Sequence, residues 1–258
     1  MNLISMAKQK DGFLGEQALV LPPAIVQRMK TDPATSILYI TDIGYYPKAY
    51  NHFRERETPI DQYVFIYCTE GRGWFSLDGQ KHPVVPNQYF ILPAGLPHAY
   101  GADEKEPWTI YWIHFGGTLA PLYCTHRTCR LTDIKPGMHS RISYRTELFE
   151  EIFRVLKMGY SLENLSYASS VFHHYLGSLR YLREYREAVS EHRPAGEEDP
   201  VNAAIHYMKE NLGKKLTLAE LADYTGYSSS YFSNLFLKRT GYAPLSYFNQ
   251  DRKSTRLN

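Results

Sequence analysis

The sequence predicts an α+β chain in which a β-barrel or sandwich comes first, helices follow, and an all-α region comes last. Aromatic residues make up 14% of the 258 residues and gather between positions 39 and 123. Short apolar runs alternate there with turn residues, whereas residues 141–188 hold few Gly or Pro and repeat apolar residues at helical spacing. A polar stretch at residues 189–200, with two Pro and one Gly, then separates this helical region from residues 201–252. Residues 201–252 carry helix signals of their own.

Five short strands are expected in the aromatic region, with turn chemistry between them. Asp78-Gly79 is a strong hairpin signal because it lies directly between two short runs of strand character. Many short strands at regular spacing are typical of a sandwich or barrel. The expected strands cover residues 37–40, 63–68, 73–77, 89–92 and 109–115.

Two helices are expected in the middle region. The second would carry an apolar stripe of Leu176, Leu179, Leu182 and Tyr185. The spacing alone does not tell what packs against this stripe. The stripe either packs against its own domain or forms a dimer seam. We expect a barrel with an N-terminal arm at residues 1–140, a helical dimerisation segment at 141–190 and a linker at 191–200.

Composition narrows the class of protein. A hydrophobic content of 43% and a charged content of 22% suit a packed globule and exclude a largely disordered chain. The net charge is +2, but residues 201–258 carry +4 and the rest carries −2, which favours an anionic partner for the last region. Three cysteines without a Cys-x-x-Cys pair favour a reducing compartment, and no apolar run reaches eighteen residues. We therefore expect a cytoplasmic protein without a membrane partner.

Residues 201–252 predict a helix-turn-helix. Thr217 and Glu220 have the spacing of a capping box, in which each side chain bonds the other residue's backbone N–H. Gly226 is placed for the tight turn, Ser228 can cap the second helix, and Gly241 can end it.

The outward face of the second helix carries small and amide side chains, away from the expected buried Phe232 and Phe236. Small side chains let a helix approach base edges in the major groove, and Asn can bond adenine through two hydrogen bonds. The alternative is a helical hairpin with no nucleic-acid role. The candidate base readers are Ser229, Ser230, Ser233 and Asn234, and the candidate phosphate contacts are Lys214, Lys215, Lys238 and Arg239.

Several motifs of this region match a known pattern: Leu216–Ala222, Gly226–Ser228, Tyr231–Phe236, Lys238–Gly241 and Pro244–Phe248. They resemble the first helix-turn-helix of AraC-type (AraC/XylS family) transcription regulators. The pieces Glu70–Phe75, Pro93–Tyr100 and Trp112–Gly116 resemble the ligand-binding domain of the same family, a cupin-like jelly-roll barrel. The resemblance covers about residues 20–252. It implies a dimeric, ligand-responsive regulator whose partners are double-stranded operator DNA, a small-molecule effector and RNA polymerase.

The sequence departs from the family pattern in two places. Family members carry a second helix-turn-helix further on, and this chain stops before it. We therefore expect a C-terminally truncated chain in which residues 253–258 are a non-native tail that continues no helix. Leu237 stands where the family often has Lys, which removes one cation from near the DNA.

The aromatic residues of the barrel suit a sugar-like effector, because CH faces stack on rings while hydroxyls pair with polar side chains. The resemblance implies that Tyr100 and Trp112 face the effector, and His98 and Glu70 are further candidates. Period two along residues 109–115 places Ile110, Trp112 and His114 on one face. For Trp112, plain core packing is an equally favoured alternative.

The alternative function is a cupin-type sugar-processing enzyme fused to a helical module. A third reading is a DNA-binding protein whose barrel is purely structural. A cupin metal site would need His-x-His followed by Glu, and residues 63–85 lack this motif. No nucleophile motif or phosphate-binding loop appears either. We therefore expect no enzyme, no metal and no cofactor.

Overall fold

The computed structural model describes residues 8–124, 129–134, 136, 140–182, 184–186 and 200–255, and side chains up to residue 249. It divides into two compact units, residues 1–134 with 143–181, and residues 135–142 with 182–258. The linker expected at residues 191–200 lies outside the described residues except for Pro200, where a helix begins. No helix among the described residues has the length and apolar character needed to cross a bilayer.

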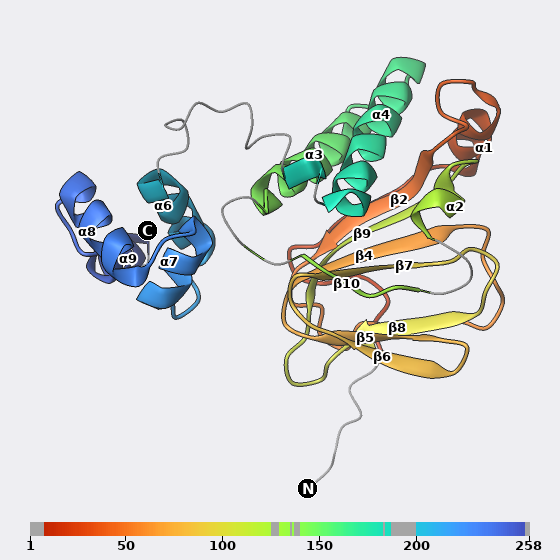
Figure 1. Cartoon of the computed structure of the whole chain (residues 1–258). Helices are drawn as coiled ribbons and strands as arrows, with labels where there is room; N and C mark the ends of the chain where they lie inside the picture. The colour runs from red at the N-terminus through yellow and green to blue at the C-terminus, as the bar shows by residue number, and fades with distance from the viewer. Residues whose placement is uncertain are drawn as a thin grey trace, which may run out of the picture. The chain divides into compact units, whose positions relative to one another are not determined.

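The first unit is a sandwich of two antiparallel sheets (Figure 1). The six-stranded sheet has the order β1-β2-β9-β4-β7-β10, and the four-stranded sheet has the order β3-β8-β5-β6. The strands are β1 (Gln17–Val20), β2 (Tyr39–Tyr46), β3 (Phe53–Arg56), β4 (Tyr63–Glu70), β5 (Gly73–Leu77), β6 (Gln80–Val84), β7 (Gln88–Leu92), β8 (His98–Ala102), β9 (Thr109–Gly116) and β10 (Thr132–Asp133). The helices of this unit are α1 (Pro23–Thr31), α2 (Ala120–Tyr123), α3 (Ile142–Lys157) and α4 (Leu162–Arg180).

All five expected strands are present, and the Asp78-Gly79 hairpin is confirmed. Asp78 has φ 49° and Gly79 has φ 75°, the two positive values that a type I′ turn between β5 and β6 requires. The strand expected at residues 37–40 begins later and runs to Tyr46. The Asp78-Gly79 hairpin implied β6 without giving its bounds, and sequence reasoning missed β1, β3, β8 and β10, which are short and lack a run of apolar residues.

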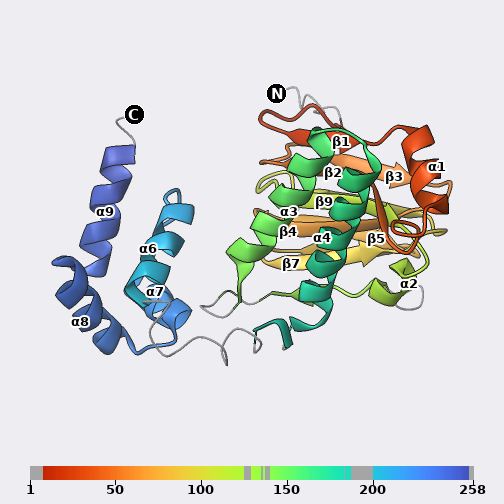
Figure 2. The same cartoon turned by 90° about the horizontal axis from the view of Figure 1, so that it is seen from above.

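Helices α3 and α4 cover the outer face of the six-stranded sheet (Figures 1 and 2). Ring contacts join them to the strands: Phe172 lies 5.3 Å from Phe115, and Tyr175 lies 5.5 Å from Phe65, measured between ring centroids. The Tyr89 hydroxyl also donates to the Leu179 carbonyl oxygen over 3.2 Å. The helices are therefore part of the core of this unit.

This packing shows that the six-stranded sheet covers the apolar stripe of α4 at Leu176 and Leu179. Leu176 and Leu179 are 1% and 3% exposed in the single chain, so the reading of the stripe as a dimer seam is wrong for these two residues. A charge at Leu179 would disrupt the unit itself. A dimerisation role for residues 141–190 stays a prediction and would have to use the outward faces of the helices.

The second unit has a small core of its own. Its helices are α6 (Pro200–Glu210), α7 (Leu218–Thr225), α8 (Ser229–Thr240) and α9 (Pro244–Thr255). The buried side chains are Val201, Ala204, Met208, Leu221, Ala222, Phe232, Phe236 and Phe248. Helix α9 continues to Thr255, so the expectation that no helix runs past Lys253 is wrong for the backbone of residues 253–255. The non-native origin of residues 253–258 stays a prediction.

Removing a ring between α4 and the sheet should destabilise the first unit. Phe172→Ala deletes a fully buried ring that contacts Phe115 and should cost about 3–5 kcal/mol of unfolding free energy. His173→Ala on the exposed side of α4 is the matched control and should stay within about 0.5 kcal/mol of the parent. Urea unfolding followed by tryptophan fluorescence measures this unit, because Trp74, Trp108 and Trp112 all lie in it. Equal losses in the two variants would contradict the packing.

Candidate functional site

A small cavity of about 20 Å³ lies between the two sheets. Its wall combines apolar and polar side chains from five strands and one loop: Tyr46, His52, Arg54, Ile66, Tyr100, Ile110, Trp112 and His114. The prediction that Ile110, Trp112 and His114 share one face of their strand is confirmed, because all three line this cavity. The volume of this cavity is far below about 300 Å³, the lower end of the usual range for small-molecule sites. A ligand larger than about one water molecule would therefore have to displace side chains of the wall.

Trp112 is both part of the core and part of the cavity wall. It lies on β9 directly between Gly44 and Ile66 of the neighbouring strands. A Cβ atom on Gly44 would lie 2.4 Å from the Trp112 ring, so only glycine leaves room for the indole there. The side chain is 8% exposed, and its Nε1 is buried with no hydrogen-bond partner among the described residues. An indole N–H can only donate, so this position holds an unused donor.

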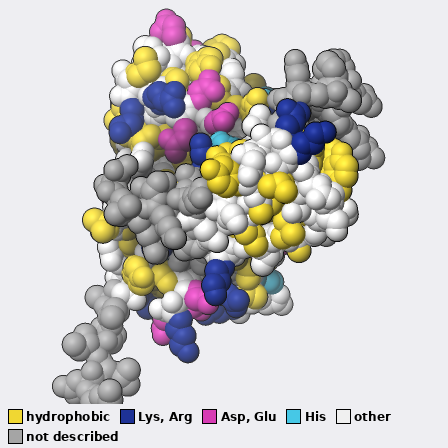
Figure 3. All heavy atoms as spheres, turned by 90° about the vertical axis from the view of Figure 1, so that its left-hand side faces the viewer, with side chains coloured by type: hydrophobic (Ala, Val, Ile, Leu, Met, Phe, Trp, Pro, Cys, Tyr) yellow, Lys and Arg dark blue, Asp and Glu magenta, His cyan; other side chains and the backbone are white. Residues whose placement is uncertain are grey.

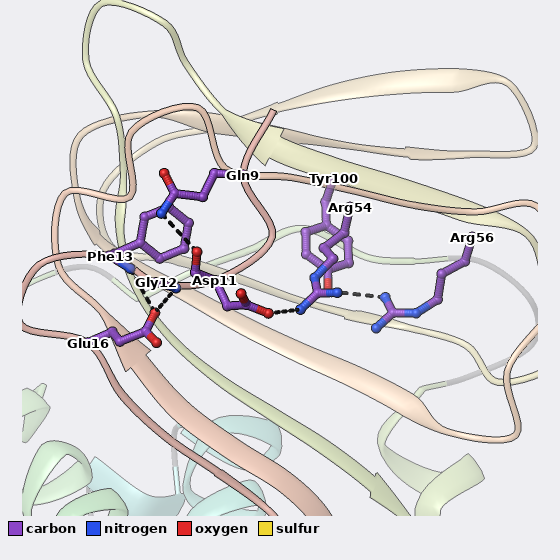
Figure 4. Close-up of polar contacts among 8 residues, drawn as sticks. All are labelled: Gln9, Asp11, Gly12, Phe13, Glu16, Arg54, Arg56 and Tyr100. Atoms are coloured by element: carbon purple, nitrogen blue, oxygen red, sulfur yellow. Dashed lines mark hydrogen bonds and ion pairs between the residues drawn. The ribbon is translucent and has the colours of Figure 1, made fainter. Parts of the chain in front are cut away.

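Strands β3 and β8 bring two arginines beside the polar groups of the cavity. Arg54 pairs in register with Tyr100, and Arg56 pairs with His98. The Arg56 guanidinium donates to the Tyr100 hydroxyl over 3.1 Å and lies 3.4 Å from His98 Nε2 (Figure 4). His98 is the first residue of β8.

The N-terminal segment contacts the same side of the barrel. Asp11 pairs with Arg54 over 3.4 Å, and the Glu16 carboxylate accepts hydrogen bonds from the Gly12 and Phe13 backbone N–H groups (Figure 4). The Phe13 ring lies 4.9 Å from the Tyr46 ring and belongs to the sandwich core. This segment is therefore an ordered part of the unit from residue 8 onward.

The hydrogen bonds of two buried histidines fix where their protons lie. Trp108 Nε1 donates to His52 Nδ1 over 3.1 Å, so the hydrogen of the neutral His52 ring is on Nε2. Burial, helped by the charges of Arg54 and Arg56, lowers the pKa of His52 to about 3. His98 Nδ1 donates to the Leu96 carbonyl oxygen over 2.9 Å, and burial lowers the pKa of His98 to about 4. Both rings are neutral at pH 7.

His114 and Asp42 form a pair at another point of the wall, with His114 Nδ1 3.4 Å from an Asp42 oxygen. Burial lowers the pKa of His114, while Asp42 opposes that shift. Burial alone would raise the pKa of Asp42, but the hydrogen bond and charge of His114 lower it overall. The Thr41 hydroxyl donates to the same carboxylate over 2.7 Å.

The structure brings together three of the four expected effector residues. Tyr100 and Trp112 line the cavity, and His98 connects to it through Arg56. Glu70 is exposed at the end of β4 and does not line this cavity. Sequence reasoning missed Tyr46, His52 and Arg54. The charged sequence of β3, Phe-Arg-Glu-Arg, gave no strand signal, although its period-two spacing places Arg54 and Arg56 on one face.

The helix-turn-helix has the local geometry that its sequence predicts. The capping box is confirmed: Thr217 N–H donates to Glu220 Oε2 over 2.7 Å, and Glu220 N–H donates to Thr217 Oγ1 over 3.2 Å. Gly226 and Gly241 end α7 and α8 with φ angles of 78° and 76°. Ser228 caps α8, because its hydroxyl accepts from the Tyr231 backbone N–H.

Helix α8 exposes two of its four candidate base readers fully and the other two in part. Ser230 and Asn234 are exposed and Ser229 and Ser233 are half-buried, while Phe232 and Phe236 fill the core. The four candidate phosphate contacts Lys214, Lys215, Lys238 and Arg239 are all exposed. Lys214 also donates to the Asn211 side-chain oxygen over 2.9 Å.

Sequence reasoning missed two large side chains of this surface, Tyr227 and Tyr231. Tyr231 is 54% exposed, and its ring lies 4.9 Å from that of Tyr227. Leu237, which the sequence placed near the DNA, is exposed as well. Figure 3 shows hydrophobic and basic side chains together on the face that it presents. Exposed aromatic residues at helical spacing from Asn234 would have signalled these neighbours in the sequence.

A metal-binding group is not evident in the described part of the chain, where no three or more His, Cys, Asp or Glu side chains are placed to hold one ion.

A barrel with a small polar cavity and a separate helix-turn-helix unit define a transcription regulator with a ligand-binding domain and a DNA-binding domain. The chain belongs to the AraC family: residues 43–175 match the AraC-like ligand binding domain, and residues 208–249 match the bacterial regulatory helix-turn-helix proteins of the AraC family. The cupin-like fold expected for the N-terminal part is thereby confirmed.

Three relatives resemble the chain over most of its length. The MmsAB operon regulatory protein of Pseudomonas aeruginosa is 29% identical over 89% of this chain and 72% of its own length. The raffinose operon transcriptional regulatory protein RafR of Pediococcus pentosaceus is 29% identical over 71% of this chain and 65% of its own length. The lactose operon transcription activator of Staphylococcus xylosus is 24% identical, with coverage of 82% and 72%.

The neutral histidines should make the first unit sensitive to acid. The unfolded chain binds a proton at each histidine near pH 6.5, whereas folded His52 and His98 bind one only near pH 3 and 4. The unfolded state therefore gains protons as pH falls, and each residue should remove roughly 2 kcal/mol of stability between pH 7 and pH 5.

Urea unfolding at the two pH values, followed by tryptophan fluorescence, tests this expectation. His98→Gln should lose about 2 kcal/mol less than the parent over that interval. His173→Gln, at an exposed position of α4, is the matched control and should keep the parent's pH dependence. An unchanged pH dependence in His98→Gln would mean that the His98 ring is protonated in the folded barrel.

Proposed function

We propose that the chain is an effector-responsive regulator that reads operator DNA through α8 and binds a small polar molecule in the barrel cavity. The observation that carries this proposal is the unpaired Trp112 Nε1 in the wall of a cavity, inside a domain of the family's ligand-binding type. A purely structural barrel would gain stability from pairing or removing that donor. The names of two relatives refer to raffinose and lactose operons, which supports a carbohydrate-like effector.

The effector would act by shifting a conformational equilibrium of a homodimer. Two arrangements would differ in their affinity for the effector, and only one would place the DNA-binding units at the operator's spacing. The outward faces of α3 and α4 support dimerisation there, because they expose Tyr144 and Tyr167, and Met158 is exposed directly after α3. RNA polymerase is a further partner in this proposal.

Asn234→Ala should weaken binding to the preferred DNA sequence by about 1–3 kcal/mol and relax preference at one base position. The side chain is exposed on α8, away from the core rings, and short enough to reach a base edge. Selection from random DNA with the full-length gene product identifies the preferred sequence, and fluorescence anisotropy then measures affinity. Asn202→Ala, at an exposed position of α6, is the matched control. Equal weakening on preferred and random DNA would remove Asn234 from the base-reading set.

Lys238→Ala should weaken binding to all sequences by a similar factor. An exposed lysine at the end of α8 contributes charge to the phosphate backbone and carries no sequence information. The slope of log affinity against log salt concentration should fall by about one unit. A loss confined to the preferred sequence, with an unchanged slope, would assign Lys238 to base contact instead.

An effector in the cavity should stabilise the first unit. At about 100 times its dissociation constant, it would add about 2.7 kcal/mol. A thermal-shift screen of monosaccharides, disaccharides and their acids should give at least one hit, and Tyr100→Phe and Trp112→Phe should weaken that hit. A ligand whose thermal shift is unchanged in both variants binds outside the cavity. A screen in which no compound shifts the unfolding temperature would contradict a carbohydrate-like effector.

A further inference from the structure

We propose that Leu237 reads a thymine of the operator through the thymine methyl group, and that the face of α8 around it reads A·T base pairs. The inference rests on the proposed function, in which α8 enters the major groove of operator DNA. It deepens that function by naming the kind of base pair that is read, and by adding a residue outside the proposed set of base readers.

The exposed apolar side chains of the second unit gather on α8 and at its two ends. Among the described side chains of this unit, the large exposed ones are Tyr227, Tyr231, Leu237 and Tyr242. Two of them lie within α8, and the other two lie directly before its N-cap and directly after its C-cap. Apolar side chains scattered singly over a surface need no explanation, whereas four around one helix indicate an interaction surface.

Leu237 lies on the same face of α8 as two of the proposed base readers. It follows Ser230 by seven residues and Asn234 by three, spacings that return to one face of a helix, and it is 49% exposed. Seven residues at about 1.5 Å each span about 10 Å, which equals about three base-pair steps of about 3.4 Å. When α8 follows the groove, Ser230 and Leu237 therefore lie at opposite ends of a short run of base pairs.

The side chains of this face match A·T pairs better than G·C pairs. Guanine is read by the cations of Arg or Lys, and cytosine by the carboxylates of Asp or Glu. The face formed by Ser230, Ser233, Asn234 and Leu237 carries none of these groups. The amide of an asparagine can bind adenine through two hydrogen bonds, and a serine hydroxyl can donate or accept at either base.

Leucine has one counterpart in the major groove. Its side chain has no donor or acceptor, so it cannot bond a phosphate or a polar base edge. The thymine methyl is the apolar group that the base edges offer there. Contact between the two removes apolar surface of both partners from water, which is favourable without any hydrogen bond. The next two residues, Lys238 and Arg239, are exposed and supply charge toward the phosphates beside this contact.

Deoxyuridine tests the contact directly, because it lacks only the methyl group of thymidine and keeps every hydrogen-bonding atom. The preferred sequence of the full-length gene product is selected from random DNA, and its thymines are then replaced by deoxyuridine one at a time. Fluorescence anisotropy measures each dissociation constant. We expect at least one replacement to weaken binding about fourfold, the size of effect that burying one apolar carbon has. Thymines in the flanking DNA are the internal control and should tolerate replacement.

Variants of Leu237 assign the methyl contact to this residue. Leu237→Ala should bind the thymine sequence at least fourfold more weakly than the parent, and it should bind the deoxyuridine sequence with the same affinity as the thymine one. Leu237→Met keeps an apolar side chain of similar volume and should retain the difference between the two sequences. Leu237→Lys should lose that difference and bind random DNA more tightly, with a salt slope steeper by about one unit.

The variants should all keep the fold of α8, because the position is exposed and alanine, methionine and lysine are good helix formers. Asn202→Ala on α6 is the matched control and should show the parent's response to deoxyuridine.

Three outcomes would overturn the proposal. These are no thymine whose replacement weakens binding, a deoxyuridine effect that persists in Leu237→Ala, and a Leu237→Ala loss of equal size on preferred and random DNA, which would place the side chain at the backbone. If one of them occurs while Asn234→Ala still relaxes preference at one base position, α8 reads the operator and only the thymine contact fails. If neither variant alters sequence preference, the proposed reading of DNA through α8 fails as well.

Discussion

The two faces of β9 constrain the rest of the first unit. Alternate residues of this strand point to opposite sides of the sheet, and both sides are covered. Ile110, Trp112 and His114 line the cavity, whereas Tyr111 and Phe115 contact Phe149 of α3 and Phe172 of α4. A shift of one residue in register would send the cavity residues into the helix layer. The same pairings of β9 with β2 and β4 therefore position the cavity wall and the surface on which α3 and α4 pack.

The second unit depends on different constraints, because its helices are short. Isolated helices of this length are marginal in water, so tertiary packing and caps must stabilise them. Phe232 and Phe236 supply the packing, while Thr217, Ser228 and the left-handed Gly226 and Gly241 define the helix ends. These features fix the orientation of α8, and its solvent face is then free to carry Ser230 and Asn234, which contribute little to helix stability.

The sequence predicts elements well where the local chemistry is strong. The Asp78-Gly79 turn, the Thr217–Glu220 capping box and the Gly241 helix end are all confirmed, because each depends on residues within a few positions of one another. The cavity depends on distant pairings instead. Arg54 meets Tyr100 only because β3 pairs with β8, and β3 has no apolar pattern to reveal it. The stripe of α4 shows a second limit: periodicity identifies an apolar face, but it does not tell whether the sheet or another copy covers that face.

Trp112 can be part of the hydrophobic core and also offer a hydrogen bond to a ligand. Its ring packs against Tyr46 and leaves no space for a side chain at Gly44, so it behaves as core. Its Nε1 has no hydrogen-bond partner among the described residues, so the same side chain carries an unused donor in the cavity wall. A site with a buried unpaired donor discriminates strongly between ligands that supply an acceptor and those that do not, because only the former remove the penalty. Selectivity for a ligand can therefore come from a residue that the fold already requires.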